Sequence, residues 1–162
     1  MTLPSDLSRI VEAEYPRFSD PEMTRRRMAV EALLRQAGCD HLVFCGANRF
    51  GSAVQWLTQW PVTAEAVGVF TPRERDALFV QYVNHASQAR ILADKADVAW
   101  GGESSVAAAS KVLEQRGARQ DRVVVLDAGA VVETGAYREL IARESSVLHR
   151  LAVQAGVRVT GD

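Results

Sequence analysis

Residues 46–52, GANRFGS, carry two glycines at the spacing of a phosphate-binding loop. They lie between a strand-like apolar run and a helix-like segment, and the N-terminus of a helix attracts anions. Ser52 and Ala53, however, replace the lysine and the following Ser or Thr of that motif. Because no lysine is available for the β- and γ-phosphates and no hydroxyl is placed for Mg²⁺, the segment does not support nucleotide hydrolysis.

Other residues with reactive side chains also lack the spacing of a catalytic site. His41, His85 and His149 are far apart in the chain, with no H-E-x-x-H or Cys/His ligand pattern. Ser104 and Ser105 lie outside any G-x-S-x-G sequence, so they are interpreted as helix caps. The sequence therefore predicts no catalytic residue, no metal site and no cofactor.

Composition narrows the classes of partner. The 162 residues are 48% hydrophobic, and 19 basic against 20 acidic residues give a net charge of -1, which predicts one globular domain that does not bind nucleic acid. The densest basic run, residues 25–27, is interpreted as a solvated helix face. The chain contains no apolar run of the roughly 20 residues that span a bilayer and no signal-like N-terminus, so we expect a cytoplasmic protein that does not enter membranes.

The elements that would position any site alternate between helices and short strands. Asp20 is a candidate N-cap followed by Pro21, and Gly38 is a left-handed stop, which together predict a helix over 20–37. Asn84 is likewise a candidate cap. Alternating elements of this kind predict a layered α/β sheet. The strands are expected at 41–45, 66–70, 77–83 and 97–100, and the helices at 52–59, 84–95 and from 104 or 105 to 117.

The last 40 residues predict a hairpin and one long helix. Residues 122–126 and 131–134 are rich in β-formers, and Asp127 and Gly129 between them favour a tight turn. An apolar stripe from Tyr137 to Ala155 then indicates an amphipathic helix that begins after Gly135. Such a stripe must be buried, so we expect the helix to dock on the same sheet.

Residues 20–120 resemble the N-terminal domain of the creatinase/prolidase family of metallopeptidases. The resemblance begins with TRRRMAVEALLRQAGCDHLVFCGANRFGSAVQWLTQW and continues through LFVQYVNHASQAR and DVAWGGE, which are similar to a branch related to Xaa-Pro aminopeptidases. It implies an α/β accessory unit with a layered mixed sheet flanked by helices. In that family this unit helps to dimerise the enzyme and lends loop residues to the partner's active site, whereas the two-metal chemistry belongs to a separate catalytic domain that has no counterpart here.

The resemblance carries over to four loop residues. Trp60 and Thr63 follow the segment similar to the family's YLTGW, and Asn84 and His85 lie in the YNH-like turn. The resemblance implies that they contact a partner's substrate pocket. The alternative is local structure: Asn84 caps a helix, His85 lies in its first turn and Trp60 packs at a helix end.

Residues 121–156 resemble the C-terminal end of an ABC transporter ATP-binding domain, in which a hairpin precedes a helix. The alternative is a divergent end of the first family. The expected organisation is an arm at 1–19, the main domain at 20–121 and a docked tail at 122–162. The positions that fit the ABC-like pattern are Asp121, Val125, Leu126, Asp127, Gly129, Glu133, Gly135, Tyr137, Glu139 and Leu140.

These patterns predict a non-catalytic accessory or dimerisation domain related to Xaa-Pro peptidases, and not an enzyme. The expected partner is a second copy or a peptidase subunit. Two alternatives stay open at this point. The chain is a truncated or fused gene remnant without selected activity, or it is a nucleotide-binding relative of the ABC ATPases.

Overall fold

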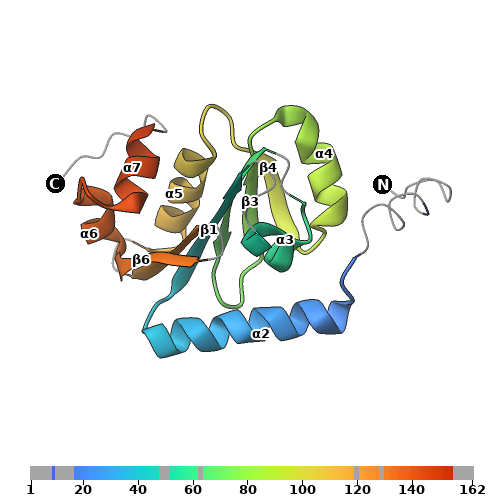
Figure 1. Ribbon diagram of the computed structural model, residues 1–162, viewed down its shortest axis with the longest axis horizontal. Coiled ribbons are helices and arrows are strands. Elements are labelled where there is room, and N and C mark those ends of the chain that lie inside the picture. Colours follow the sequence, from blue (N-terminus) through green and yellow to red (C-terminus); the bar gives the residue numbers. More distant parts are fainter. Residues whose placement is uncertain are drawn as a thin grey trace.

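A six-stranded mixed β-sheet organises the chain (Figure 1). The computed structural model describes residues 9, 17–47, 52–61, 64–118, 121–127 and 130–154. The strand order is β4-β3-β2-β1-β5-β6, in which β1/β5 and β3/β4 are parallel pairs and the other three pairs are antiparallel. The strands are β1 (His41–Ala47), β2 (Glu65–Phe70), β3 (Asp76–Val80), β4 (Ala96–Trp100), β5 (Arg122–Asp127) and β6 (Ala130–Ala136).

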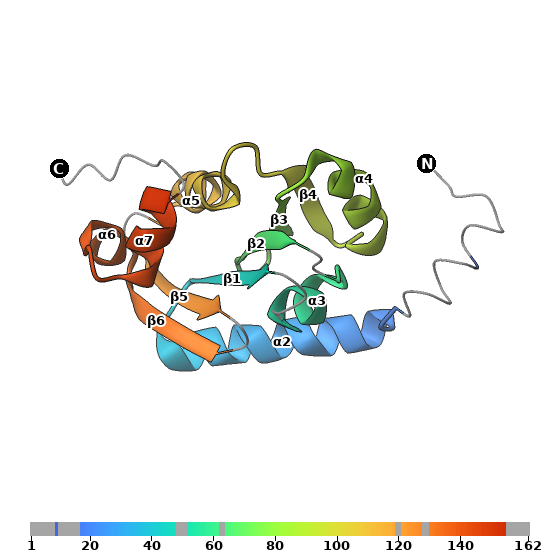
Figure 2. The ribbon, with the colours of Figure 1, turned by 45° about the horizontal axis from the view of Figure 1, so that its top comes forward.

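Helices cover both faces of this sheet, as expected from strands that are buried on both sides. One apolar core lies between the sheet and α2, α3 and α4, and a second lies between the sheet and α5, α6 and α7. Figure 2 shows α2 on one side of the sheet and α5, α6 and α7 on the other. The helices are α2 (Asp20–Ala37), α3 (Ser52–Thr58), α4 (Val83–Leu92), α5 (Ser105–Gln115), α6 (Tyr137–Ala142) and α7 (Val147–Gln154).

The centre of the sheet is packed around one large side chain. Phe44 of β1 is fully buried and lies opposite Gly68 of β2. A Cβ atom at Gly68 would collide with the ring of Phe44. Glycine at this position therefore gives the phenylalanine ring its space in the core between the sheet and α2.

The helix predicted over residues 20–37 is confirmed, with a different cap. Ser19, not Asp20, is the N-cap, and its Oγ accepts a hydrogen bond from the Glu22 N–H at 3.4 Å. Gly38 ends the helix with φ 60°, a left-handed conformation that glycine adopts without strain. Asp20 is the first residue of the helix, and Pro21 follows it in the first turn, where the missing N–H of proline costs no helical hydrogen bond.

The basic run at 25–27 is not a solvated face, which corrects the sequence interpretation. Only Arg25 projects into solvent. Arg26 is 7% exposed, and its guanidinium donates to Glu22 Oε1 and to the Trp56 carbonyl at 2.8 and 3.0 Å. Arg27 reaches a buried carboxylate of β3. Two of the three arginines thus fasten α2 to the rest of the fold.

The strand β3 is shorter than predicted, and α4 begins earlier. The strand ends at Val80, and Tyr82 is the N-cap residue of α4, without a side-chain capping bond. The predicted cap, Asn84, is wrong because the N–H of His85 already bonds to the Tyr82 carbonyl at 3.0 Å, which places Asn84 inside the first turn. The helix ends at Leu92 instead of residue 95. The helix predicted from residue 104 or 105 is confirmed, with Ser104 as its cap.

The hairpin of β5 and β6 is confirmed, and β5 also pairs with β1 inside the sheet. The single long helix is wrong, because α6 and α7 are separate helices. Ser146 Oγ accepts the His149 N–H at 3.2 Å, and Glu133 Oε2 accepts the Leu148 N–H at 3.1 Å. This cap begins a new helix at α7. Leu140 of α6 and Leu148 of α7 are both buried in the second core.

Among the described residues, none of the helices combines the length and the apolar character needed to cross a bilayer.

Candidate functional site

Three aromatic side chains form a corner where α3 ends and α4 begins. We call Trp60, Tyr82 and His85 the aromatic corner. The ring centroids of Trp60 and His85 are 6.0 Å apart with planes tilted by 56°, and those of Tyr82 and His85 are 5.3 Å apart in an edge-on arrangement at 86°. Both separations lie in the range of favourable aromatic pairs. The histidine therefore bridges a buried ring and an exposed one.

Local hydrogen bonds at the end of α3 fix the position of Trp60. Thr58 Oγ1 donates to the Val54 carbonyl at 2.6 Å and accepts the Trp60 N–H at 3.3 Å. Between them, Gln59 has φ 69°, a left-handed conformation that is uncommon for a residue with a side chain. Its Oε1 accepts the Phe18 N–H at 2.7 Å, which holds the chain in this turn. The turn ends the helix and directs the indole inward.

The outer side of the aromatic corner is open to solvent. Tyr82 is 51% exposed, and so is Trp100 at the end of the neighbouring strand β4. Trp100 Nε1–H donates to the carbonyl of Gln81 at 2.9 Å, so its indole stands beside the segment that carries the tyrosine. Val83 adds an exposed apolar side chain. These groups together present an aromatic surface at the carboxyl ends of β3 and β4.

The structure brings two of the four predicted site residues together. Trp60 and His85 are in ring contact, whereas Asn84 is exposed on the first turn of α4. Thr63 lies outside the described residues. Sequence reasoning missed Tyr82 and Trp100. The available signal was their position, since Trp100 ends β4 and Tyr82 lies two residues beyond the end of the neighbouring strand β3.

A second constellation resembles the parts of a catalytic triad. His41 Nδ1 lies 3.0 Å from Thr71 Oγ1, and His41 Nε2 lies 3.0 Å from Asp121 Oδ2. Arg116 Nη1 donates to the same threonine oxygen at 3.0 Å. An aspartate, a histidine and a hydroxyl in this order could transfer a proton from the hydroxyl to the imidazole.

Burial argues against chemistry at this constellation. His41 is only 2% exposed, and the threonine hydroxyl is occupied by the imidazole on one side and by the guanidinium of Arg116 on the other. A nucleophile needs an open position for the reacting carbon. We therefore interpret His41, Thr71 and Asp121 as a structural contact between three segments, which we call the histidine clamp. It joins the start of β1, the end of β2 and the segment before β5.

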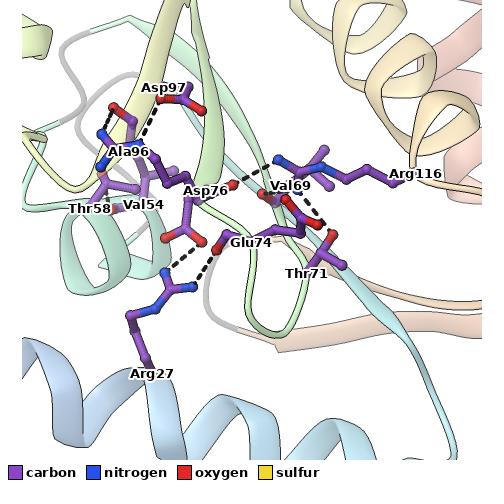
Figure 3. A network of polar contacts seen from close by, with 11 residues as sticks. Arg27, Val54, Thr58, Val69, Thr71, Glu74, Asp76, Ala96, Asp97 and Arg116 are labelled. Carbon is purple, nitrogen blue, oxygen red and sulfur yellow. Dashed lines mark hydrogen bonds and ion pairs between the residues drawn. The ribbon is translucent and has the colours of Figure 1, made fainter.

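Arginines also fasten the turn between β2 and β3 (Figure 3). Arg27 Nη1 donates to Asp76 Oδ1 at 2.7 Å, and Arg27 Nη2 donates to the Glu74 carbonyl at 2.9 Å. Arg116 Nη2 donates to the Arg75 carbonyl at 2.7 Å. Burial raises the pKa of the Asp76 carboxyl, and this outweighs the opposing effect of the neighbouring guanidinium groups.

Metal and nucleotide sites find little support in the described part of the chain. No group of three His, Cys, Asp or Glu side chains there could hold a metal ion. Of the phosphate-loop-like segment, Gly46 and Ala47 end β1 and Ser52 begins α3, whereas 48–51 lie outside the described residues.

Solved structures with a similar fold are Xaa-Pro peptidases. No protein-family model matches the chain, and no curated protein matches it in sequence. An Xaa-Pro dipeptidase from Bacillus anthracis aligns with a TM-score of 0.52 and 13% identity, over 64% of this chain and 26% of that one. An aminopeptidase P (Xaa-Pro aminopeptidase) from Streptococcus thermophilus aligns with a TM-score of 0.51 and 20% identity, over 64% of this chain and 73% of that one. An Xaa-Pro aminopeptidase from Streptococcus pyogenes aligns with a TM-score of 0.53 and 14% identity, over 66% of this chain and 75% of that one.

These alignments confirm the predicted fold class, an α/β sheet of the creatinase/prolidase N-terminal-domain type. The chain spans about a quarter of the length of the Bacillus anthracis structure, at 26%. None of the three structures is an ABC ATPase, so the predicted ABC-like resemblance of residues 121–156 is left without support.

Proposed function

We propose that this chain is a non-catalytic accessory domain of the kind that accompanies Xaa-Pro peptidases. Its role is association with a second copy or with a peptidase subunit, and not peptide hydrolysis. The fold that it shares with Xaa-Pro peptidase structures supports this role. The buried thiol of Cys39 is in keeping with the reducing cytoplasm, which we propose as its location.

The aromatic corner is the observation that carries the proposal. Its exposed ring, Tyr82, and the neighbouring Trp100 offer flat apolar faces on a rigid base. Proline-containing segments bind to such aromatic surfaces because the proline ring is apolar and loses little conformational entropy. We propose that the corner contacts the proline-containing peptide in a partner's substrate pocket, with His85 held in position by Trp60.

The docked tail belongs to the same proposal. The parallel pairing of β5 with β1 supports a single unit in which β5 and β6 of the tail complete the sheet of the main domain. Leu140 and Leu148 are buried in the same core as residues of α5 and β5, which also supports this organisation. Neither observation favours a nucleotide-binding role or a gene remnant.

Peptidase activity gives the first test. The purified chain is incubated with Xaa-Pro peptides and Mn²⁺, Zn²⁺ or Co²⁺, and peptide cleavage is followed by chromatography. We expect no turnover with any of the metals. Hydrolysis that co-purifies with the chain would overturn the non-catalytic role.

Peptide binding gives the second test. A proline tripeptide and its alanine counterpart are titrated into the chain while indole and imidazole NMR signals are followed. We expect the proline peptide to shift the signals of Trp60, His85 and Trp100 more than the alanine peptide does. Tyr82→Ala should weaken this binding several-fold, whereas Val153→Ala, which truncates an exposed side chain on α7, should leave it unchanged. Equal responses to both peptides would contradict the role of the corner.

A further inference from the structure

We propose that residues 17–19, just before α2, form a strap that holds the aromatic corner in the conformation described above. Gln59 is the positioning residue that connects the strap to the corner. The consequence for peptide binding rests on the function proposed above, whereas the connection itself is a property of the free chain. In Figure 1 the strap leaves the N-terminal end of α2 toward α4, and Arg17 reaches the end of that helix.

The strap contacts both helices that hold the aromatic corner. Its Phe18 N–H donates at 2.7 Å to Oε1 of Gln59, which lies just beyond the end of α3. Its Arg17 Nη2 donates to the carbonyl of Leu92, the last residue of α4, at 3.4 Å and pairs with Asp94 Oδ1 at 2.9 Å. A segment that is attached to two helices in this way restrains their relative position.

A stacked arginine gives the strap a third attachment. The guanidinium carbon of Arg26 lies 3.6 Å from the centroid of the Phe18 ring and 5.0 Å from the centroid of the Trp56 ring. Cation–π contacts are favourable within about 6 Å of the ring centroid. Arg26 Nη1 also donates to the Trp56 carbonyl at 3.0 Å, so the same side chain joins the strap, α2 and α3. Removal of the Phe18 ring should therefore loosen the strap while every residue of the corner is kept.

Gln59 transmits the position of the strap because its side chain and its backbone are both constrained. The residue is 8% exposed and has φ 69°, which is uncommon outside glycine. If the strap leaves, Gln59 Oε1 loses the Phe18 N–H, and a buried acceptor without a partner costs free energy. The side chain must then turn toward water, and the strained backbone relaxes with it. The next residue, Trp60, is displaced by that relaxation.

Trp60 carries the change to the exposed surface of the corner. Its buried indole is in ring contact with His85, which in turn is in ring contact with the half-exposed Tyr82. Closely packed side chains have discrete arrangements, so a changed turn at Gln59 should reorient the histidine and the tyrosine together. A seated strap thus favours the formed corner, and a released strap favours a rearranged one.

The strap is held less firmly than the core, which a switching segment requires. Phe18 is 38% exposed, and the ion pair of Arg17 with Asp94 is also partly open to solvent. Exposed ion pairs contribute little to stability. Local opening of a segment with few buried contacts needs much less free energy than global unfolding. The strap can therefore be released while the sheet stays intact.

Solution NMR of the free chain tests the connection. Phe18→Ala removes the ring beneath Arg26, and Gln59→Gly removes the acceptor while placing a residue that adopts the left-handed turn without strain. We expect both changes to shift the imidazole signals of His85. These signals are the readout because Gln59 adjoins Trp60 in the chain and would shift its indole signal directly. Gln59→Glu, which keeps a side-chain oxygen as acceptor, should leave the His85 signals close to their wild-type positions.

The matched control is Met28→Ala, which truncates an exposed side chain on α2 and should leave the His85 signals unchanged. Circular dichroism verifies that all variants are folded. If the His85 signals respond to neither Phe18→Ala nor Gln59→Gly, or respond equally to Met28→Ala, the strap proposal is overturned. The proposed accessory function is unaffected by either result.

A proline tripeptide provides the reciprocal test. Because linkage is mutual, a strap that favours the binding conformation of the corner is itself favoured by the bound peptide. We expect Gln59→Gly to raise the dissociation constant of the tripeptide about fivefold, and saturating peptide to slow hydrogen exchange of the wild-type Phe18 N–H by a similar factor. Weaker binding without slower exchange would mean that Gln59 contacts the peptide itself, against the strap proposal. A chain that binds no tripeptide would contradict the proposed function, and the His85 signals of the free chain would then decide on the strap.

Discussion

The two ends of strand β3 differ in how their polar and aromatic groups are used. At its start, Asp76 is buried and bonded to Arg27, and the preceding turn is held by further arginines. Just beyond its end, Tyr82 projects half exposed, and Trp100 stands beside the same segment. The first end satisfies its groups within the chain, whereas the second leaves apolar surface uncovered.

This difference indicates that one end of β3 serves folding stability and the other end serves contact with a partner. Buried charges that lose their partners are costly, so the turn end should respond to mutation mainly through the free energy of unfolding. Exposed aromatic rings contribute little to folding but offer area for binding. If the comparison is right, variants at the two ends will affect different measurements.

The largest effect is expected at Asp76. Asp76→Ala leaves Arg27 without its buried partner and should lower the free energy of unfolding by about 3 kcal/mol. The control is Asp97→Ala, because Asp97 also pairs with an arginine, Arg75, but both side chains are mostly exposed. Exposed pairs contribute little, so this change should cost less than about 0.5 kcal/mol. Urea unfolding measures both, and equal losses would remove the distinction between the buried and the exposed pair.

His41 of the histidine clamp and His85 of the aromatic corner provide the next test of the comparison. His41→Ala removes a buried ring with two hydrogen bonds and leaves Thr71 and Asp121 without their shared partner, at a cost of about 2 kcal/mol. His85→Ala at the aromatic corner should cost less than about 1 kcal/mol. Thermal and urea unfolding measure the two variants. A larger loss for His85 would mean that the corner, too, is part of the stabilising framework.

Two carboxylates should give pH dependences of opposite sign. The pKa of Asp76 is raised above its ordinary value of 3.8 by burial, so its favourable contribution is full below pH 3.8 and is lost as pH rises through the folded-state pKa. The pKa of Glu22 is lowered from 4.5 to about 2, mainly by hydrogen bonds from Arg25 and Arg26. Its contribution is full above pH 4.5 and is lost as pH falls toward 2.

Isosteric variants separate these two effects. Unfolding free energies are measured between pH 3 and 7 for the wild type, Asp76→Asn and Glu22→Gln. As pH rises, the free energy of unfolding of the wild type should fall relative to that of Asp76→Asn. Over the same rise in pH, it should increase relative to that of Glu22→Gln. Parallel curves for the two comparisons would show that burial does not dominate at Asp76.

The sequence predicted the elements well because local signals decided them. Gly38 and Ser104 ended and began helices as their residue types favour. The break between α6 and α7 was missed because one of its capping groups, Glu133, comes from a strand 13 residues before Ser146. Periodicity within one helix window contains no information on such a partner.

The side-chain contacts of the arginines and histidines could not be predicted either, because their partners are also distant in the sequence. Arg26 and Arg27 look like a solvated run in the sequence, and only the folded sheet shows the carbonyl and carboxylate that they reach. The histidine clamp joins His41 to Asp121, 80 residues away, so no spacing rule could have found it. Trp60 and His85 were proposed together from a resemblance, whereas their ring contact follows from the path of α3 and α4.

A small change in stability, and the sharpest test of the comparison, is expected for Tyr82→Ala. The ring of Tyr82 is half exposed and packs edge-on against His85, so its removal should lower the free energy of unfolding by less than about 0.5 kcal/mol. The proline-peptide titration should nevertheless weaken several-fold, because the exposed face of the corner is gone. Asp76→Ala, measured where the protein is still folded, should show the opposite pattern of lost stability and retained binding. A Tyr82→Ala variant that loses stability while binding the peptide normally would mean that the aromatic corner stabilises the fold and does not bind the peptide.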